Sequence, residues 1–299
     1  MKRTKGKEKS KQMIKECKIG EIKSCADLAF KLNSKPESSS AYCSKKYDSI
    51  CKDFEHMISD EEHAVVGYYE ADKLVGVMGF FVDVDKHTAD CVGPFIDDAS
   101  FLDIAKDILD FAKTLLNEST RFNFYFDQRN TDCLELMKLL NTNYNGNECS
   151  LKLERINYIP KSIEVNIELI SAENSDELIK LHDNIFPGTY VSGTDIINSL
   201  GRNRQAYCIF EQGVMVGYGV LRIDEGSSNL CVEILAVDKQ FRGKGYGKAL
   251  LSNSLKQAFS DESIKSVYLI VDDPNSVAKN LYFSYGFELE VENQSYSVK

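Results

Sequence analysis

Apolar and polar positions follow the same order twice along this chain. Short polar turns separate pairs of apolar runs at residues 69–79 and 210–219, which predicts two β-hairpins. Further along each half, a strand-like run leads to an asparagine and an amphipathic helix, at residues 122–140 and 266–285. A second short strand then follows in each half. Matching elements in matching order predict an α/β protein built from two similar domains.

The spacing of the matched positions supports a duplication. Gly76 aligns with Gly217, and each glycine precedes its matched asparagine by a similar distance, 54 positions to Asn130 and 58 positions to Asn275. Two unrelated α/β domains could share this order by chance, but the common register favours a duplicated domain.

A break in the pattern around Pro160 predicts the boundary between the two domains. We therefore expect a first domain at residues 16–158 and a second domain at residues 163–299. The first fifteen residues carry seven lysines and arginines against a single glutamate, which predicts a flexible, solvated basic arm.

Composition favours a globular protein and argues against a membrane-spanning, secreted or nucleic-acid-binding one. Hydrophobic residues make up 43% of the chain, no apolar run is long enough to span a membrane, and no apolar segment follows the basic N-terminus as in a signal peptide. The nine cysteines form no C-x-x-C pair and have no zinc-ligand spacing with the four histidines. We expect reduced thiols in a cytoplasmic monomer or homodimer without a metal. A net charge of −10 argues against a nucleic-acid partner.

The most informative chemical motif is a glycine-rich, cationic turn at residues 242–248, Arg-Gly-Lys-Gly-Tyr-Gly-Lys. An apolar run at residues 230–237 precedes it, and a helical pattern follows. Unpaired N–H groups at the start of a helix attract anions, and glycines let the backbone approach a phosphate closely. A Walker A loop is excluded because Ala249 replaces its hydroxyl residue, and a dinucleotide fingerprint is excluded because Leu250 replaces its last small residue.

The pattern that remains is Arg-x-x-Gly-x-Gly, and a second motif lies at residues 275–287, where Asn, Ala, Tyr and Gly-Phe recur. Together these motifs resemble the GNAT superfamily of acyl-CoA-dependent N-acyltransferases, well over residues 164–299 and in outline over the first half. The resemblance implies two tandem domains, each a mixed, mostly antiparallel sheet flanked by helices. It also implies acetyl-CoA as cosubstrate and a primary amine of a small molecule or peptide as acceptor, acetylated by direct attack on the thioester.

The same resemblance implies which residues bind the cofactor. The turn would hold the pyrophosphate of coenzyme A through backbone N–H groups, and the preceding strand would pair with the pantetheine arm where two strands splay apart. Asn275 would contact the pantetheine, although Asp-Pro-Asn at this point suits a helix start equally well. The implied cofactor residues are Leu235, Ala236, Val237, Arg242, Gly243, Lys244, Gly245, Tyr246, Gly247, Lys248, Asn275 and Ala278.

Two side chains are candidates for the chemistry. Tyr282 matches the family's proton donor to the departing thiolate, and the alternative is a core aromatic residue. Glu233 lies in an apolar strand, where burial would raise its pKa and suit it as a base for the incoming ammonium. The alternative for this glutamate is a salt bridge on an open sheet face. Tyr190 and Asp195 are candidates to line the acceptor site.

The first half departs from the motif pattern. Residues 91–101 contain no Arg-x-x-Gly-x-Gly, and Asp97 and Asp98 would repel a pyrophosphate. Met137 stands where the second half has Tyr282. We therefore expect the first half to keep the fold without cofactor binding, and the second half to act as an N-acetyltransferase. The alternative function is a non-catalytic acyl-CoA binding or regulatory module.

Overall fold

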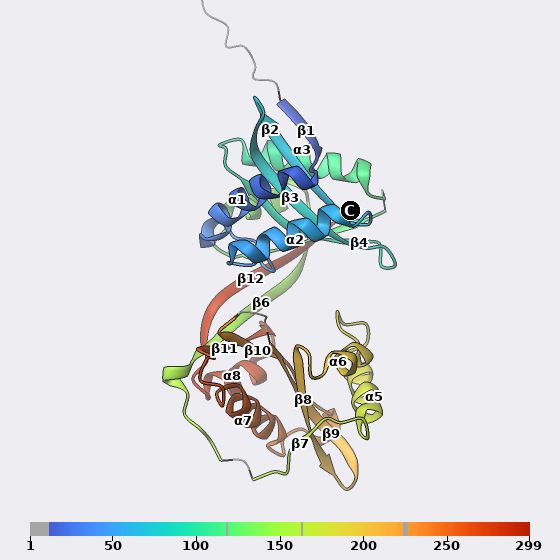
Figure 1. Cartoon of the computed structure of the whole chain (residues 1–299), viewed down its shortest axis with the longest axis vertical. Helices are drawn as coiled ribbons and strands as arrows, with labels where there is room; N and C mark the ends of the chain where they lie inside the picture. The colour runs from blue at the N-terminus through green and yellow to red at the C-terminus, as the bar shows by residue number, and fades with distance from the viewer. Residues whose placement is uncertain (1–11, 118, 163, 224–226) are drawn as a thin grey trace, which may run out of the picture. The chain divides into compact units, whose positions relative to one another are not determined.

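The computed structural model describes residues 12–117, 119–162, 164–223 and 227–299, which form two compact units (Figure 1). The N-terminal unit holds the chain up to Glu148 together with Glu292–Lys299, and the C-terminal unit is Cys149–Val291. The chain passes between these units at residues 148–149 and 291–292, whereas the expected domains divide it at residues 158 and 163. Strands β6 (Asn143–Glu154) and β12 (Glu288–Val298) each contribute residues to both units. No local sequence pattern predicts that the units share these strands.

The N-terminal unit is a sheet between two pairs of helices. Its elements are β1 (Gln12–Glu16), α1 (Ile22–Asn33), α2 (Tyr47–Ser59), β2 (Ala64–Glu70), β3 (Lys73–Asp83), β4 (Thr88–Ile96), α3 (Phe101–Leu115), β5 (Arg121–Asp127) and α4 (Thr131–Leu139), with 3₁₀ turns at Ile19–Glu21 and Pro36–Ser38. Strands β1 to β4 pair antiparallel in chain order, β5 pairs parallel with β4, and β12 pairs antiparallel with β5. Helices α1 and α2 cover one face (Figure 1), and the core cluster on the other face contains α3 and α4.

Strand β1 corrects the expected basic arm, because residues 12–15 belong to a regular strand. Gln12 lies opposite Glu70 and Glu16 lies opposite Val66 in the antiparallel pair with β2. Ile14 packs against the apolar core, which holds this short edge strand in place. The rest of the expected arm, residues 1–11, lies outside the described residues.

The C-terminal unit repeats the plan. Its further elements are 3₁₀ turns at Arg155–Asn157 and Lys239–Phe241, and β7 (Glu168–Leu169), α5 (Ser175–Ile185), α6 (Gly193–Ser199), β8 (Arg204–Glu211), β9 (Val214–Ile223), β10 (Asn229–Val237), α7 (Tyr246–Ala258), β11 (Ser266–Asp272) and α8 (Ser276–Phe283). The sheet order is β7–β8–β9–β10–β11, and only the β10–β11 pair among these is parallel. Helices α5 and α6 pack on one face, and α7 and α8 pack on the other.

Both predicted hairpins and the alignment of their glycines are confirmed. Gly76 and Gly217 each lie on the second strand of a hairpin, where a Cβ would come within 3.0 Å of Ile104 and 2.8 Å of the carbonyl oxygen of Ala236, respectively. The nine cysteines are unbridged and all but Cys51 are buried, as expected for reduced thiols. In the described part of the chain, no helix is long and apolar enough to cross a membrane.

Candidate active site

The glycine-rich turn connects the end of β10 to the start of α7. Gly243 and Gly245 have φ angles of 83° and 85°, a left-handed conformation that side chains other than glycine rarely adopt. Gly245 caps the helix, so α7 begins at Tyr246. The Nε of Arg242 donates to the carbonyl oxygen of Val237 at 3.1 Å, which ties the turn to the strand before it.

The backbone of this turn presents a row of unused donors. Within the described residues, none of the N–H groups of residues 243–248 donates to another group of the chain. The first intrahelical bond of α7 runs from Ala249 N to the carbonyl of Gly245. Six successive N–H groups at the positive end of a helix dipole form an anion site suited to phosphate oxygens.

Glu211, at the end of β8, is a neighbour of the turn that the sequence did not indicate. Its Oε1 accepts from Lys244 Nζ at 2.7 Å, and its Oε2 accepts from the Tyr246 hydroxyl at 2.5 Å. The hydrogen bonds from Lys244 and Tyr246 lower the pKa of Glu211 below its ordinary value. The carboxylate therefore stays ionised and positions two side chains of the turn.

Strand β10 has one open edge beside the turn. It pairs in parallel with β11 only from Asn229 to Cys231, while Leu235 to Val237 continue to pair with β9 on the other side. Among the described residues, none continues the parallel pairing along the open edge beyond Cys231. The splayed strands and the free edge match what the resemblance implies for the pantetheine arm.

Asn275 and Tyr282 lie on the segment that follows β11. The Oδ1 of Asn275 accepts from Ala278 N at 3.2 Å, so this residue caps α8, as one of its two interpretations predicted. Tyr282 is 7% exposed and belongs to the same apolar cluster as Val232 and Leu235 of β10. Burial raises the pKa of Tyr282 to about 12, and its hydroxyl makes no hydrogen bond within the described residues.

Glu233 is held by two arginines. Its Oε2 accepts from Arg204 Nε at 2.6 Å, and its Oε1 accepts from Arg204 Nη2 at 2.8 Å and from the Tyr190 hydroxyl at 3.1 Å. The guanidinium of Arg222 lies 3.4 Å from the same Oε1. The side chain of Glu233 is 1% exposed, so this is a buried ion pair with both carboxylate oxygens engaged.

The expected rise in the pKa of Glu233 is wrong. Burial favours the protonated form, but the hydrogen bonds and charges of Arg204 and Arg222 outweigh it, and the pKa of Glu233 lies below its ordinary value. A carboxylate with a lowered pKa and two occupied oxygens is a poor proton acceptor. The salt-bridge alternative describes Glu233 better, although the pair is buried rather than open.

The two candidate chemical residues lie on opposite faces of the sheet. Glu233 is the extra residue of a bulge between Val232 and Ile234, so it shares a face with Ile234, which packs with the α5–α6 cluster. It bonds Tyr190 from the segment before α6. Tyr282 packs in the α7–α8 cluster. A thioester in the splay between β10 and β11 would have Tyr282 on one side and the Tyr190–Glu233 pair on the other. Asp195 instead caps α6, since its Oδ2 accepts from Ser192 N at 3.0 Å.

In the N-terminal unit the matching splay is filled by the chain itself. Strands β4 and β5 pair in parallel only as far as Cys91 and Phe124. Beyond that point the segment 39–41 pairs with β5, through Ala41 N and the carbonyl of Tyr125 at 2.8 Å. Ser40 Oγ accepts from Gly93 N of β4 at 3.1 Å. We call residues 39–41 the plug segment; no sequence pattern predicted it.

A second set of contacts holds the plug segment. Asn130 caps α4 through its Oδ1, as Asn275 caps α8, but its Nδ2 also donates to the carbonyl of Ser39 at 3.2 Å. Asn33 Oδ1 accepts from Ser40 N at 3.0 Å. Both asparagines are almost fully buried. Because buried polar groups need hydrogen-bond partners, their amide groups bond to the plug segment and nearby residues.

Other positions of the N-terminal unit also oppose cofactor binding. By the register from the aligned glycines, Pro94 stands where β10 has Leu235, and proline has no N–H to offer a partner. Asp97 and Asp98 precede α3, where Asp97 pairs with Lys31 at 2.6 Å and Asp98 accepts from Ser100 N. Met137 is buried at the position of the second unit's tyrosine.

The chain is similar in sequence and in fold to known acetyltransferases. A model of the Acetyltransferase (GNAT) family matches residues 175–287. An N-alpha-acetyltransferase of Sulfolobus acidocaldarius is 30% identical over 138 residues, 42% of this chain and 82% of the relative. A probable spermine N(1)-acetyltransferase of Bacillus subtilis subsp. natto is 23% identical over 139 residues, 44% of this chain and 91% of the relative. A solved tandem GNAT protein from the clavulanic acid biosynthesis pathway shares the fold, with a TM-score of 0.73 at 11% identity over 96% of this chain and 98% of that one.

Proposed function

Because the chain belongs to the GNAT acetyltransferase family, we propose that its C-terminal unit transfers an acetyl group from acetyl-CoA to a primary amine of a small molecule or peptide. The observation that carries the proposal is the row of undonated N–H groups at residues 243–248 beside the open edge of β10. The turn supplies donors for a pyrophosphate, and the edge supplies donors and acceptors for the amide groups of a pantetheine arm.

The cofactor residues take two roles in this proposal. Arg242 to Lys248 bind the pyrophosphate through their backbone, and Leu235 to Val237 pair with the pantetheine arm. Asn275 keeps its capping bond and has an exposed amide Nδ2 available for the same ligand, with Ala278 beside it on α8. The chemistry of these residues therefore suits coenzyme A.

Acetyl-CoA, once bound, supplies a thioester carbonyl carbon in the splay. A neutral amine forms the new C–N bond at this carbon while the C–S bond breaks, and the amine releases a proton to water. Tyr282 donates its hydroxyl proton to the departing sulfur and regains a proton from solvent. With a pKa of about 12, this tyrosine keeps its proton at neutral pH and can give it only as negative charge develops on sulfur.

Glu233 has a positioning role in this proposal. Its carboxylate fixes Arg204 and the Tyr190 hydroxyl on the acceptor side, and its lowered pKa keeps it ionised while it does so. The substrate amine then loses its proton to water rather than to this carboxylate. The rate should accordingly rise with pH as the free amine becomes available, with no inflection from Glu233 between pH ~6 and ~9.

Release of free thiol from acetyl-CoA, measured across amines, tests the proposed function. The panel should contain peptides with free N-termini and polyamines, which are the acceptor classes named in the two relatives, together with aminoglycosides and amino acids. We expect turnover with at least one class and its loss in Tyr282→Phe. Binding of acetyl-CoA without turnover on any amine would favour the non-catalytic module, and failure to bind acetyl-CoA would overturn both functions.

A further inference from the structure

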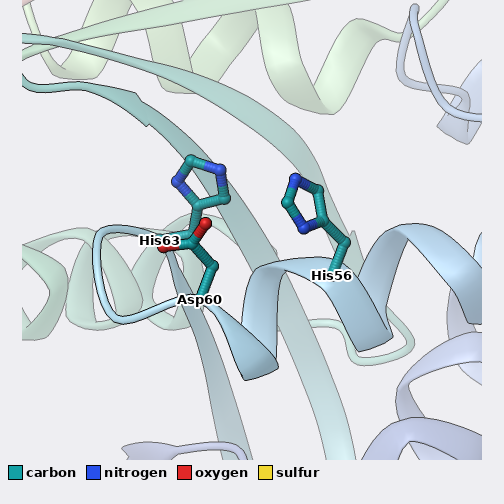
Figure 2. A group of neighbouring side chains, drawn as sticks. All are labelled: His56, Asp60 and His63. Atoms are coloured by element: carbon teal, nitrogen blue, oxygen red, sulfur yellow. The ribbon is translucent and has the colours of Figure 1, made fainter.

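Two histidines and an aspartate meet at the end of α2 in the N-terminal unit. His56 lies in the last turn of the helix, Asp60 follows the helix, and His63 directly precedes β2. One potential ligand atom from each of the three lies within 4.8 Å of the other two. Figure 2 shows the three side chains projecting to the same side of the helix end and the turn that follows it. We call them the His56–Asp60–His63 cluster.

The backbone fixes the spacing of these residues. Asp60 N donates to the carbonyl of His56 at 3.1 Å, and His63 N donates to the carbonyl of Asp60 at 3.2 Å. Asp60 Oδ1 accepts from Glu62 N at 3.0 Å, which orients the carboxylate and leaves Oδ2 without a hydrogen bond in the described chain. A ligand set whose backbone is already closed into one turn loses little freedom when an ion binds.

Phe81 of β3 forms an apolar wall behind the two imidazoles. The ring of His63 lies 5.4 Å from that of Phe81 and 5.2 Å from that of His56, nearly perpendicular to both. His56 is exposed and the other two are half-buried, so the cluster is open to solvent on one side. The arrangement combines restricted ligands with a route for an ion to enter.

We propose that the His56–Asp60–His63 cluster binds a divalent ion of the zinc class, with water completing the coordination. Imidazole nitrogen and carboxylate oxygen are preferred zinc ligands, and three protein ligands leave a position for water. Tetrahedral zinc with bonds of about 2.0–2.2 Å needs ligand atoms roughly 3.3 Å apart, so the side chains must close by about 1.5 Å. His56 is exposed at the helix end and can supply this movement by a change of rotamer.

One hydrogen bond competes with the ion. Val82 N donates to His63 Nδ1 at 3.3 Å, which places the proton of the neutral ring on Nε2. When an ion replaces that proton, the proton moves to Nδ1 and the contact with Val82 is lost. The contact is long, and Val82 is only half-buried, so water can satisfy its N–H. The expectation of no metal rests on the spacing of histidines and cysteines, which does not include this aspartate.

Full-length protein freed of metal by a chelator and titrated with Zn²⁺ by calorimetry tests the site. We expect one ion bound with micromolar or tighter affinity, and a weakening of about tenfold or more in His56→Gln, Asp60→Asn and His63→Gln. His87→Gln is the matched control, because His87 is an exposed histidine of the same unit outside the cluster. Co²⁺ absorption provides an independent readout, since histidine and carboxylate ligation lacks the intense thiolate band that binding to a cysteine would give.

Three outcomes would overturn the site: no binding by wild type, equal affinity in His56→Gln, or an equal loss in His87→Gln. A thiolate band in the Co²⁺ spectrum would also overturn it, by assigning the ion to cysteine. His63→Gln also removes the hydrogen bond from Val82 N, which belongs to the metal-free fold, so the decisive variant is His56→Gln. The side chain of His56 makes no hydrogen bond in the described chain, and its removal should leave thermal unfolding of the metal-free protein unchanged.

Discussion

The two units contain the same splay between parallel strands, but its contents differ. In the C-terminal unit, among the residues that the structure describes, the edge of β10 beyond Cys231 is open beside a turn of unused N–H groups. In the N-terminal unit the plug segment 39–41 occupies the corresponding gap and bonds both flanking strands. A splayed pair of strands therefore does not by itself make a cofactor site, because its polar groups must be satisfied by a ligand or by the protein.

The capping asparagines show the same contrast at one pair of positions. Both cap a helix through Oδ1, but the Nδ2 of Asn130 is buried against the plug segment and Asn275 is exposed. One asparagine thus completes a fold, and the other is available to a ligand. The N-terminal unit thus keeps the same architecture while the amide of its capping asparagine is used within the fold.

The largest effect on stability should come from Glu233, which lies at a bulge in β10. Glu233→Gln would leave Arg204 and Arg222 without their shared carboxylate. We expect the free energy of unfolding in urea at pH 7 to fall by about 3 kcal/mol, as for a broken buried ion pair. Glu211→Gln removes an exposed pair and is the control, with a loss of less than about 1 kcal/mol. Equal losses in the two variants would contradict the buried ion pair.

The pH dependence of this difference has a definite sign. Because the pKa of Glu233 is lowered in the folded state, its contribution is fully present above the ordinary glutamate pKa of ~4.3 and disappears as the pH falls through the folded-state value. The stability gap between wild type and Glu233→Gln should therefore stay constant from pH 8 to about 5 and narrow below pH ~4. A gap that widens on acidification would mean that the pKa is raised.

Substitutions at the matched positions Tyr282 and Met137 test whether only the C-terminal unit catalyses acetyl transfer. Tyr282→Phe should lower kcat by about 10²–10³-fold through loss of the proton donor. Its affinity for acetyl-CoA should be unchanged, and so should its stability, since the lost hydroxyl has no hydrogen-bond partner in the described chain. Met137→Leu is the control and should leave kcat unchanged. A wild-type kcat in Tyr282→Phe would remove the tyrosine from the mechanism.

The two capping asparagines allow the contrast between the splays to be measured. Asn130→Ala removes a cap and the bond to Ser39 in a buried site, so we expect a loss of about 2 kcal/mol in the free energy of unfolding and no change in acetyl-CoA affinity. Asn275→Ala should cost only about 0.5–1 kcal/mol and should weaken acetyl-CoA binding. Calorimetric titration with acetyl-CoA measures the affinity, and unfolding in urea measures the stability of each variant. Weaker acetyl-CoA binding in Asn130→Ala and unchanged binding in Asn275→Ala would instead place the ligand in the N-terminal unit.

Gly245 tests the turn itself. Gly245→Ala places a Cβ at a φ of 85°, which strains the backbone by about 1–2 kcal/mol and displaces the N–H groups. Acetyl-CoA affinity should fall by about tenfold. Gly201→Ala is the matched control, because Gly201 has a φ of 75° with open space around it, as Gly245 has, and lies between α6 and β8. Equal losses of affinity would show that general destabilisation is the cause.

The sequence predicted those features that depend on local pattern. The hairpins, the glycine turn, Asn130 and Asn275 all follow from periodicity and spacing within a few dozen residues. The plug segment, the partners of Glu233 and the shared strands β6 and β12 depend on pairing between distant segments, which no local pattern records. The plug segment lies in a polar loop before α2, and nothing in that loop's sequence predicts that its backbone pairs with β5. Burial alone suggested a raised pKa for Glu233 because its arginine partners lie on other strands, β8 and β9.

The smallest predicted effect concerns Glu211, the carboxylate beside the anion site. Glu211→Gln removes a negative charge near the pyrophosphate and releases Lys244, whose Nζ it now holds at 2.7 Å. Both changes favour an anion, and since the side chains are partly exposed, affinity for acetyl-CoA should rise by only about two- to fivefold. Glu70 occupies the matching position of the first hairpin, so Glu70→Gln should have no effect. A weaker affinity in Glu211→Gln would mean that Glu211 promotes binding by orienting Lys244 and Tyr246. This orienting effect would then outweigh the repulsion between its charge and the pyrophosphate. Measurement at two salt concentrations separates the explanations, because only the charge effect should shrink as salt increases.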